Sequence, residues 1–347
     1  MKRRTLIQAT AGAALGAPAL VGFAQQAVTL KFHTFMSPVS NVWINMHKAW
    51  MDKVEKDSNG RIKFEAYPAM QLGGNPGQLY DQARDGVVDV AWTLPGNTTG
   101  RFPRIEAFEL PFMLNNAEAT SKALWEYYQT YALEEFKETQ VIALHVHGPG
   151  MFHSATKPIR TAADLKGMKV RGPTRQVTKL LSSLGAAPVG FPLPQIPDAL
   201  SKGTVEAACI PWEVVPSVKV HELCKQHSEF PANMPGLYTT TFVMTMNKAK
   251  YDSLAPDLKR VIDANSGLAT SGWLGKVQQA GDIPGRKAAV DRGNTLYTFT
   301  KEQTDEFIRL SSHVDDEWAA DMDKRGMKGK ELLQAARTLI AKHGKTT

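Results

Sequence analysis

The sequence places a permanently charged side chain, Arg171, at the end of a short apolar run that begins at Met168. A guanidinium is planar and carries five N–H donors in a fixed arrangement, which matches the two oxygens of a carboxylate. We therefore predict that Arg171 binds the acid group of a small solute. The alternative is an arginine that pairs with a neighbouring acidic side chain.

A second candidate for chemistry is the pair His145 and His147, which alternate on one predicted strand and so share a face. They have the residue type for a metal site, but no carboxylate or third histidine follows at ligand spacing, and we interpret them as strand residues near a hinge. The signatures GxSxG, HExxH and the P-loop are absent from the sequence. We therefore predict neither an enzyme nor a cofactor or metal site.

The first 24 residues read as an export signal rather than as part of the fold. Lys2, Arg3 and Arg4 precede a short, alanine-rich apolar stretch that ends in small residues near Ala24. The paired arginines are typical of a twin-arginine signal, although Sec signals also contain such pairs. The sequence therefore predicts a periplasmic protein, and the absence of a later long apolar run predicts a soluble one.

The composition is that of an ordinary globular protein, with 43% hydrophobic and 22% charged residues. The formal net charge of +7 falls to about +4 once the signal is removed, which gives no case for nucleic acid. The sequence leaves open whether Cys209 and Cys224 form a disulfide or remain two buried thiols.

The pattern of apolar residues predicts an α/β fold in which strands and helices alternate. A nearly continuous apolar run at 87–92 is typical of a buried parallel strand. Strands are predicted at 28–33, 61–67, 87–92, 141–147, 168–171, 189, 205–210, 239–247 and 295–299. Helices are predicted from about 43 to 54 and at 79–86, 117–139, 162–165, 176–184, 196–202, 302–324 and 329–343.

The glycines and proline of 148–150 interrupt this pattern, and the chain is expected to change domain there. We predict one domain from residues 25–148 plus about 237–281. The second is predicted from 149–236 plus about 282–347. A cleft between two such lobes would bind a ligand at the carboxyl ends of the strands.

Six short stretches then show a resemblance to a known family. They are Gln71-Leu-Gly-Gly74, Gly86-Val-Val-Asp89, Glu109-Leu-Pro-Phe112, Asp164-Leu-Lys-Gly-Met-Lys-Val-Arg171, Leu184-Gly-Ala-Ala-Pro188 and Lys202-Gly-Thr-Val-Glu206. In this order, over most of the chain that follows the signal, they resemble the periplasmic solute-binding subunits of tripartite ATP-independent periplasmic (TRAP) transporters, the DctP-like family.

The resemblance implies a two-lobed periplasmic binding protein fold with hinge strands and a long bracing helix. It implies one small and one large membrane subunit as partners, and uptake that an ion gradient drives. The arginine that ends the Lys-Val-Arg strand of the family holds the ligand carboxylate, so the resemblance gives this role to Arg171. The protein is expected to be monomeric.

Departures from the family pattern bear on the ligand. Where sialate-binding relatives have a second arginine, this chain has Met151, and where many members have an asparagine it has Ile210, followed by Trp212 and Glu213. Metal-bridging relatives place a glutamate where Cys209 stands, so the resemblance implies no metal here.

A pocket with one certain cation and apolar walls favours a monocarboxylate whose remainder is apolar or aromatic. The further candidates for ligand contact near the cleft are Phe35, Asn41, Trp92, Thr93, Phe112, Phe152 and Phe242. A C4-dicarboxylate, and a sensing subunit that docks on a membrane receptor instead of a transporter, stay open as alternatives.

Overall fold

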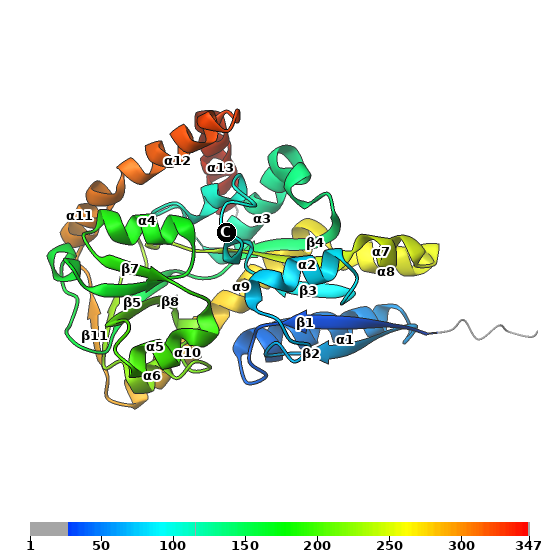
Figure 1. The fold of residues 1–347 in the computed structure, drawn as a ribbon, viewed down its shortest axis with the longest axis horizontal. Coiled ribbons are helices and arrows are strands. Elements are labelled where there is room, and N and C mark those ends of the chain that lie inside the picture. The colour runs from blue at the N-terminus through cyan, green and yellow to red at the C-terminus, as the bar shows by residue number, and fades with distance from the viewer. Residues whose placement is uncertain (1–26, 115, 346–347) are drawn as a thin grey trace, which may run out of the picture.

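The computed structural model describes residues 27–114 and 116–345. The predicted export signal at 1–24 lies outside the described residues. The chain builds two separate β-sheets flanked by helices, as Figure 1 shows. This confirms the predicted α/β class with two lobes.

The first sheet has five strands in the order β2-β1-β3-β10-β4. β1 runs parallel to β2 and β3, whereas β10 runs antiparallel to β3 and β4. The late strand β10 thus completes a sheet that the N-terminal part of the chain begins. Its strands are β1 Val28–Thr34, β2 Ile62–Tyr67, β3 Val90–Thr93, β4 Thr139–Val146 and β10 Thr241–Asn247.

The second sheet has six strands in the order β11-β9-β5-β8-β6-β7. β6 is parallel to β7 and β8, and β5 is antiparallel to β8 and β9. Its strands are β5 Gly150–Ser154, β6 Lys169–Gly172, β7 Ala187–Gly190, β8 Ala207–Pro211, β9 Gln226–Glu229 and β11 Thr295–Thr298.

The helices cover both sheets and connect them (Figure 1). α9 packs on the first lobe against α3 and β4, and α10 follows it directly to pack on the turn after β8 in the second lobe. The α9–α10 pair therefore braces the two lobes. The α-helices are α1 Lys48–Asp57, α2 Leu79–Arg84, α3 Ala117–Tyr127, α4 Arg175–Ser183, α5 Ile196–Ser201, α6 Val220–Leu223, α7 Lys248–Ser253, α8 Pro256–Ala264, α9 Gly267–Ala280, α10 Asp282–Asp291, α11 Lys301–Ser311, α12 His313–Lys324 and α13 Gly329–Gly344.

The C-terminal helices contact both lobes. α11 packs against α4 of the second lobe, whereas α13 packs along α3 of the first. Trp318 of α12 and Leu332 of α13 share a buried cluster with Phe108 and Val141. Residues 282–347 were assigned to the second domain, but the helices near the C-terminus also pack on the first lobe. The domain boundaries stay a prediction.

Two segments of chain cross between the sheets beside one another. One joins β4 to β5, and the other joins β9 to β10. The backbone N–H of Gly150 donates to the carbonyl of Tyr238 at 3.0 Å, and a Cβ on Gly150 would lie 1.9 Å from the Tyr238 ring. Only glycine leaves room for this contact, which explains the Gly148-Pro149-Gly150 signal at the predicted crossing.

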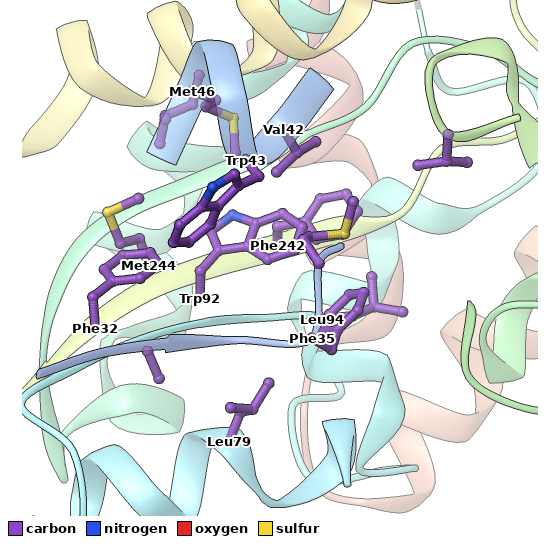
Figure 2. Close-up of a cluster of buried hydrophobic side chains, with 14 of the residues drawn as sticks. Phe32, Phe35, Val42, Trp43, Met46, Leu79, Trp92, Leu94, Phe242 and Met244 are labelled. Atoms are coloured by element: carbon purple, nitrogen blue, oxygen red, sulfur yellow. The ribbon is translucent and has the colours of Figure 1, made fainter. Parts of the chain in front are cut away.

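Buried aromatic and sulfur-containing side chains fill the first lobe next to the cleft (Figure 2). Trp92 of β3 lies parallel to Phe242 of β10, with ring centroids 4.6 Å apart. Phe32 of β1 and Met244 of β10 come from the two strands that flank β3 in the same sheet, and both are fully buried. This core holds the end of β3 in a fixed position.

Two strands, β5 and β9, were not among the predicted elements. The sequence of β9, Gln226–Glu229, is entirely polar and carries no apolar alternation. It nevertheless pairs with β5 and β11, and its buried side chains find polar partners, as His227 does with Asn294. The predicted helix at 302–324 divides into α11 and α12 at Ser312.

Candidate functional site

A cavity lies where strand ends from both sheets meet. β6 and β8 bring Arg171 and Ile210 to its wall, β3 brings Trp92, and the residue after β4 is His147. The space between the lining side chains, mouth included, is about 450 Å³. The position of the cavity matches the rule for open α/β sheets, in which ligands bind at the carboxyl ends of the strands.

Arg171 is the one arginine or lysine among the described residues that line this cavity. Its side chain is buried, with 2% of its surface exposed. Nε donates to the carbonyl of Phe191 at 3.0 Å and Nη1 to the carbonyl of Cys209 at 3.4 Å. Among the described residues no carboxylate pairs with it, so the alternative of an arginine paired with a neighbouring acid does not hold here.

The guanidinium stays charged at neutral pH although its surroundings oppose the charge. Burial lowers the pKa of Arg171 to about 10, while the neighbouring Tyr238 and Cys209 act in the opposite direction. The hydroxyl of Tyr238 donates to the carbonyl of Cys209 at 2.8 Å. A buried charge without a counter-ion is costly, and an anion that accepts its remaining N–H groups would offset that cost.

An aromatic wall faces this cation from the first lobe. Trp92 and Phe242 both line the cavity, and Phe35 lies against Trp92 with ring centroids 5.4 Å apart. The indole N–H of Trp92 donates to Nε2 of His145 at 2.8 Å, which fixes the ring plane. The wall offers apolar surface to a ligand and no charge.

His147 lines the cavity but carries no charge of its own. Its Nδ1 pairs with the carbonyl of Gly148, and its Nε2 accepts from the backbone N–H of Thr240 at 3.2 Å. Burial lowers the pKa of His147 to about 4, and the charge of Arg171 lowers it further. The histidine is therefore neutral at physiological pH and leaves Arg171 as the sole cation of the site among the described residues.

A buried acid and amide form another part of the lining. Glu213, in the turn after β8, accepts at Oε1 from the side chain of Gln278 at 2.7 Å. Burial raises the pKa of Glu213 to about 8, and the nearby Asp282 adds to this effect. At neutral pH the carboxyl is therefore largely protonated.

Half of the twelve predicted contact residues line the cavity. They are Phe35, Trp92, Arg171, Ile210, Glu213 and Phe242. The remaining six lie elsewhere, for reasons that are local to each. Contact with a ligand stays a prediction for all twelve.

Strand geometry separates Met151 from Phe152. Successive residues of β5 point to opposite faces, so the two side chains cannot both face the cleft. Phe152 is fully buried in the core behind the sheet, 6.1 Å from Phe307 between ring centroids. Met151 pairs in register with Ile210, but lines a neighbouring hollow with Trp212 rather than this cavity.

Trp212 packs instead against two buried histidines, and its indole N–H donates to Glu229 at 3.2 Å. The hydroxyl of Thr93 donates to the carbonyl of Pro76, and the amide of Asn41 donates to the carbonyl of Val277. Phe112 lies edge-on to Phe230, 5.7 Å between ring centroids. These four side chains have their own partners outside the cavity.

Several lining residues were not predicted. The polar ones are Asn97, His147, Tyr238, Thr240 and Gln278. The apolar ones are Met36, Leu94, Pro173, Leu193, Pro211 and Val214. Two of them could be noticed in the sequence. His147 belongs to the pair with His145, and Pro211 directly follows the predicted strand at 205–210.

Three further observations concern the cysteines, possible metal ligands and possible membrane spans. Cys209 and Cys224 are both buried and are not bonded to each other. Among the described residues, no cluster of three or more His, Cys, Asp or Glu side chains is arranged to hold a metal ion. Nor does any described helix have the length and apolar character needed to cross a membrane.

Two α/β lobes joined by crossing strands, with a buried unpaired cation in the cavity between them, define the architecture of a solute-binding protein. The family described as bacterial extracellular solute-binding protein, family 7 (DctP), matches residues 33–321. The chain belongs to this family, which supplies the solute-binding subunits of TRAP transporters, as the resemblance implied.

Solved structures of two relatives agree closely with this fold. A TRAP solute-binding protein from Rhodoferax ferrireducens, in complex with copurified benzoate, is 67% identical with a TM-score of 0.92, over 92% of this chain and 99% of that one. A marine metagenome TRAP solute-binding protein, described as specific for aromatic acid ligands and crystallised with 3-hydroxybenzoate, is 47% identical with a TM-score of 0.90, over 92% and 99%.

A more distant relative is known from its sequence. The protein described as outer membrane transporter protein TsaT of Comamonas testosteroni is 26% identical over 316 residues, which are 90% of this chain and 92% of the relative. The similarity therefore extends along nearly the full length of both chains.

Proposed function

We propose that this protein is a periplasmic receptor that binds an aromatic monocarboxylate through Arg171 and delivers it to the membrane subunits of a TRAP transporter. The observation that carries the proposal is the buried guanidinium that no described acid neutralises. A carboxylate ligand supplies the missing negative charge together with acceptors for the N–H groups that Phe191 and Cys209 leave unused.

The shape and polarity of the cavity support an aromatic remainder. Trp92 and Phe242 line the same cavity as Arg171, and Ile210 adds an aliphatic surface. Burial of apolar ligand surface contributes about 25 cal/mol per Å², and aromatic pairs add to it. A benzoate-sized acid would therefore gain binding free energy both from Arg171 and from the apolar wall.

The same composition argues against a C4-dicarboxylate. A second carboxylate would need a second cation or several N–H donors, and the described lining offers no other arginine or lysine. The two solved relatives with bound benzoate and 3-hydroxybenzoate point in the same direction.

The lining residues also favour delivery of the ligand over its chemical conversion. The cavity holds no nucleophile with an adjacent base among its described lining residues, since His147 uses both ring nitrogens in backbone contacts. In our proposal the lobes, with the domain boundaries predicted from the sequence, close on the acid and present a docking surface to the small and large membrane subunits.

A ligand screen tests the proposal directly. The purified chain without its export signal is titrated calorimetrically with benzoate, with cyclohexanecarboxylate and with succinate. We expect benzoate to bind most tightly and succinate not to bind. A thermal shift gives the same order, because a ligand at 100 times its Kd adds about 2.7 kcal/mol of stability. Tight succinate binding, or hydrolysis of benzoate esters, would contradict the proposal.

A further inference from the structure

The cavity contains a second polar group besides Arg171, formed by Glu213 and Gln278. Both side chains line the cavity and are nearly inaccessible to solvent, with exposed fractions of 3% and 1%. Gln278 donates from Nε2 to Oε1 of Glu213 at 2.7 Å. No described residue offers a hydrogen-bond partner to Oε2 of Glu213 or to Oε1 of Gln278.

Such a pair of unsatisfied oxygens is unusual in a folded protein. Buried polar atoms almost always have hydrogen-bond partners, and each exception requires an explanation. Here both unsatisfied atoms belong to residues that line one ligand cavity. The other polar side chains of the lining behave differently, since the hydroxyl of Tyr238 and the ring nitrogens of His147 have backbone partners.

The neighbouring backbone holds Glu213 in place. Its N–H donates to Oδ1 of Asp282 at 2.9 Å. Glycines at the α9–α10 junction allow this close packing: a Cβ on Gly285 would lie 2.0 Å from the carbonyl of Trp212, and one on Gly281 would lie 2.9 Å from Cβ of Glu213. These contacts hold the backbone of Glu213, and the hydrogen bond from Gln278 orients its carboxyl.

The hydrogen-bonding pattern also defines what the pair can recognise. Because Gln278 donates to Oε1 of Glu213, the proton of the neutral carboxyl belongs on Oε2. Oε2 then donates, while Oε1 of Gln278 accepts. A hydroxyl group both accepts and donates one hydrogen bond, so it satisfies both atoms at once.

We propose that Glu213 and Gln278 form a second polar subsite that recognises a hydroxyl group on the ring of the aromatic acid held by Arg171. This rests on the proposed function and specifies its ligand class as hydroxylated aromatic carboxylates. No ion pair joins Glu213 to Arg171 in the described structure, so the acid end and the hydroxyl end are separate recognition elements.

The test compares hydroxyl with methyl substituents, which have similar sizes but differ in hydrogen bonding. Calorimetric Kd values are measured for 2-, 3- and 4-hydroxybenzoate and for the three matching methylbenzoates. In the wild-type protein at least one hydroxyl isomer should bind about tenfold or more tightly than its methyl counterpart. Glu213→Leu should reduce that ratio to near one, and Glu213→Gln, which keeps a donor and an acceptor, should preserve most of it.

Gln278→Met serves as a second variant should Glu213→Leu fail to fold, and it should reduce the same ratio. Equal binding of each hydroxyl and methyl pair by the wild-type protein would overturn the inference. So would a preference for hydroxyl that survives in both apolar variants. If the wild-type protein binds benzoate but shows no such preference, only this inference fails, whereas absence of binding by every aromatic acid refutes the proposed function itself.

Discussion

Two arginines four residues apart, Arg171 and Arg175, have opposite surroundings. Arg171 lies near the end of strand β6, and its hydrogen bonds to described residues go to the backbone carbonyls of Phe191 and Cys209. Arg175 begins helix α4 and forms two hydrogen bonds to Glu106, at 3.2 and 2.5 Å, and one to Asp321 at 3.0 Å. Two carboxylates neutralise Arg175, whereas no described carboxylate pairs with Arg171, which agrees with the role that we propose for Arg171.

The difference shows how a binding charge is distinguished from a structural one. Arg175 joins the second lobe to Glu106 of the first lobe, and Gln176 donates to the same carboxylate at 2.6 Å. Arg171 lies deeper, with 2% of its surface exposed against 20% for the side chain of Arg175. The more buried charge is therefore the one that lacks a counter-ion, which is the reverse of what stability alone would favour.

The strongest test of this comparison removes Arg171. Arg171→Ala should reduce benzoate affinity by more than 100-fold, because a buried charge pair contributes about 3 to 5 kcal/mol. The melting temperature of the unliganded variant should stay close to that of the wild-type protein, since no side-chain ion pair is lost. Calorimetry and a thermal melt measure both, and retained affinity would show that the acid binds elsewhere.

Removing Arg175 should give the opposite pattern. Arg175→Ala leaves Glu106, which is 6% exposed, without its cation, and we expect a loss of about 3 kcal/mol of stability. The Kd for benzoate should change less than it does in Arg171→Ala. The double variant Arg175→Ala/Glu106→Gln should recover part of the lost stability, which chemical denaturation measures. A variant as stable as the wild-type protein would contradict the structural role.

Glu213 is a buried acid with no cation beside it among the described residues, and its titration makes stability depend on pH. The pKa of Glu213 is raised from 4.5 to about 8, so the folded protein keeps this proton to higher pH than the unfolded chain does. The contribution of Glu213 to the free energy of unfolding is therefore present below about pH 4.5 and falls as pH rises from there to about 8.

Glu213→Gln removes that titration. Its stability relative to the wild-type protein should rise between pH 4.5 and 8 by up to about 5 kcal/mol, because a pKa difference of one corresponds to about 1.4 kcal/mol. Denaturation curves at several pH values measure this difference. The matched control is the same substitution at Glu222, whose side chain is 43% exposed. A flat difference for Glu213→Gln would show that its carboxyl is ionised in the folded state.

The smallest effect is expected at the other partner of Arg175. The side chain of Asp321 is 30% exposed, so solvent screens its interaction with the guanidinium. Asp321→Asn should cost less than about 1 kcal/mol. Urea denaturation compares it with Arg175→Ala, and an equal loss would assign the structural role to Asp321 instead of Glu106.

The sequence predicted the elements better than the contacts of individual side chains. Apolar runs located most strands, and the cation at the end of β6 was recognisable because strand ends of α/β sheets face the cleft. The polar strand β9 was missed, since only its neighbours β5 and β11 give it a reason to form. Phe152 and Trp212 were predicted at the cleft but pack in other places.

The sequence by itself determined the α/β class, the family and the arginine that ends a strand, because periodicity, order of motifs and residue type are local properties. Only the tertiary structure decided that Arg175 has two acidic partners, whereas Arg171 has none within 27–114 and 116–345. It also brought Gln278 of α9 to Glu213, 65 residues away in the chain. Such pairings depend on how distant segments pack, and no local pattern in the sequence encodes them.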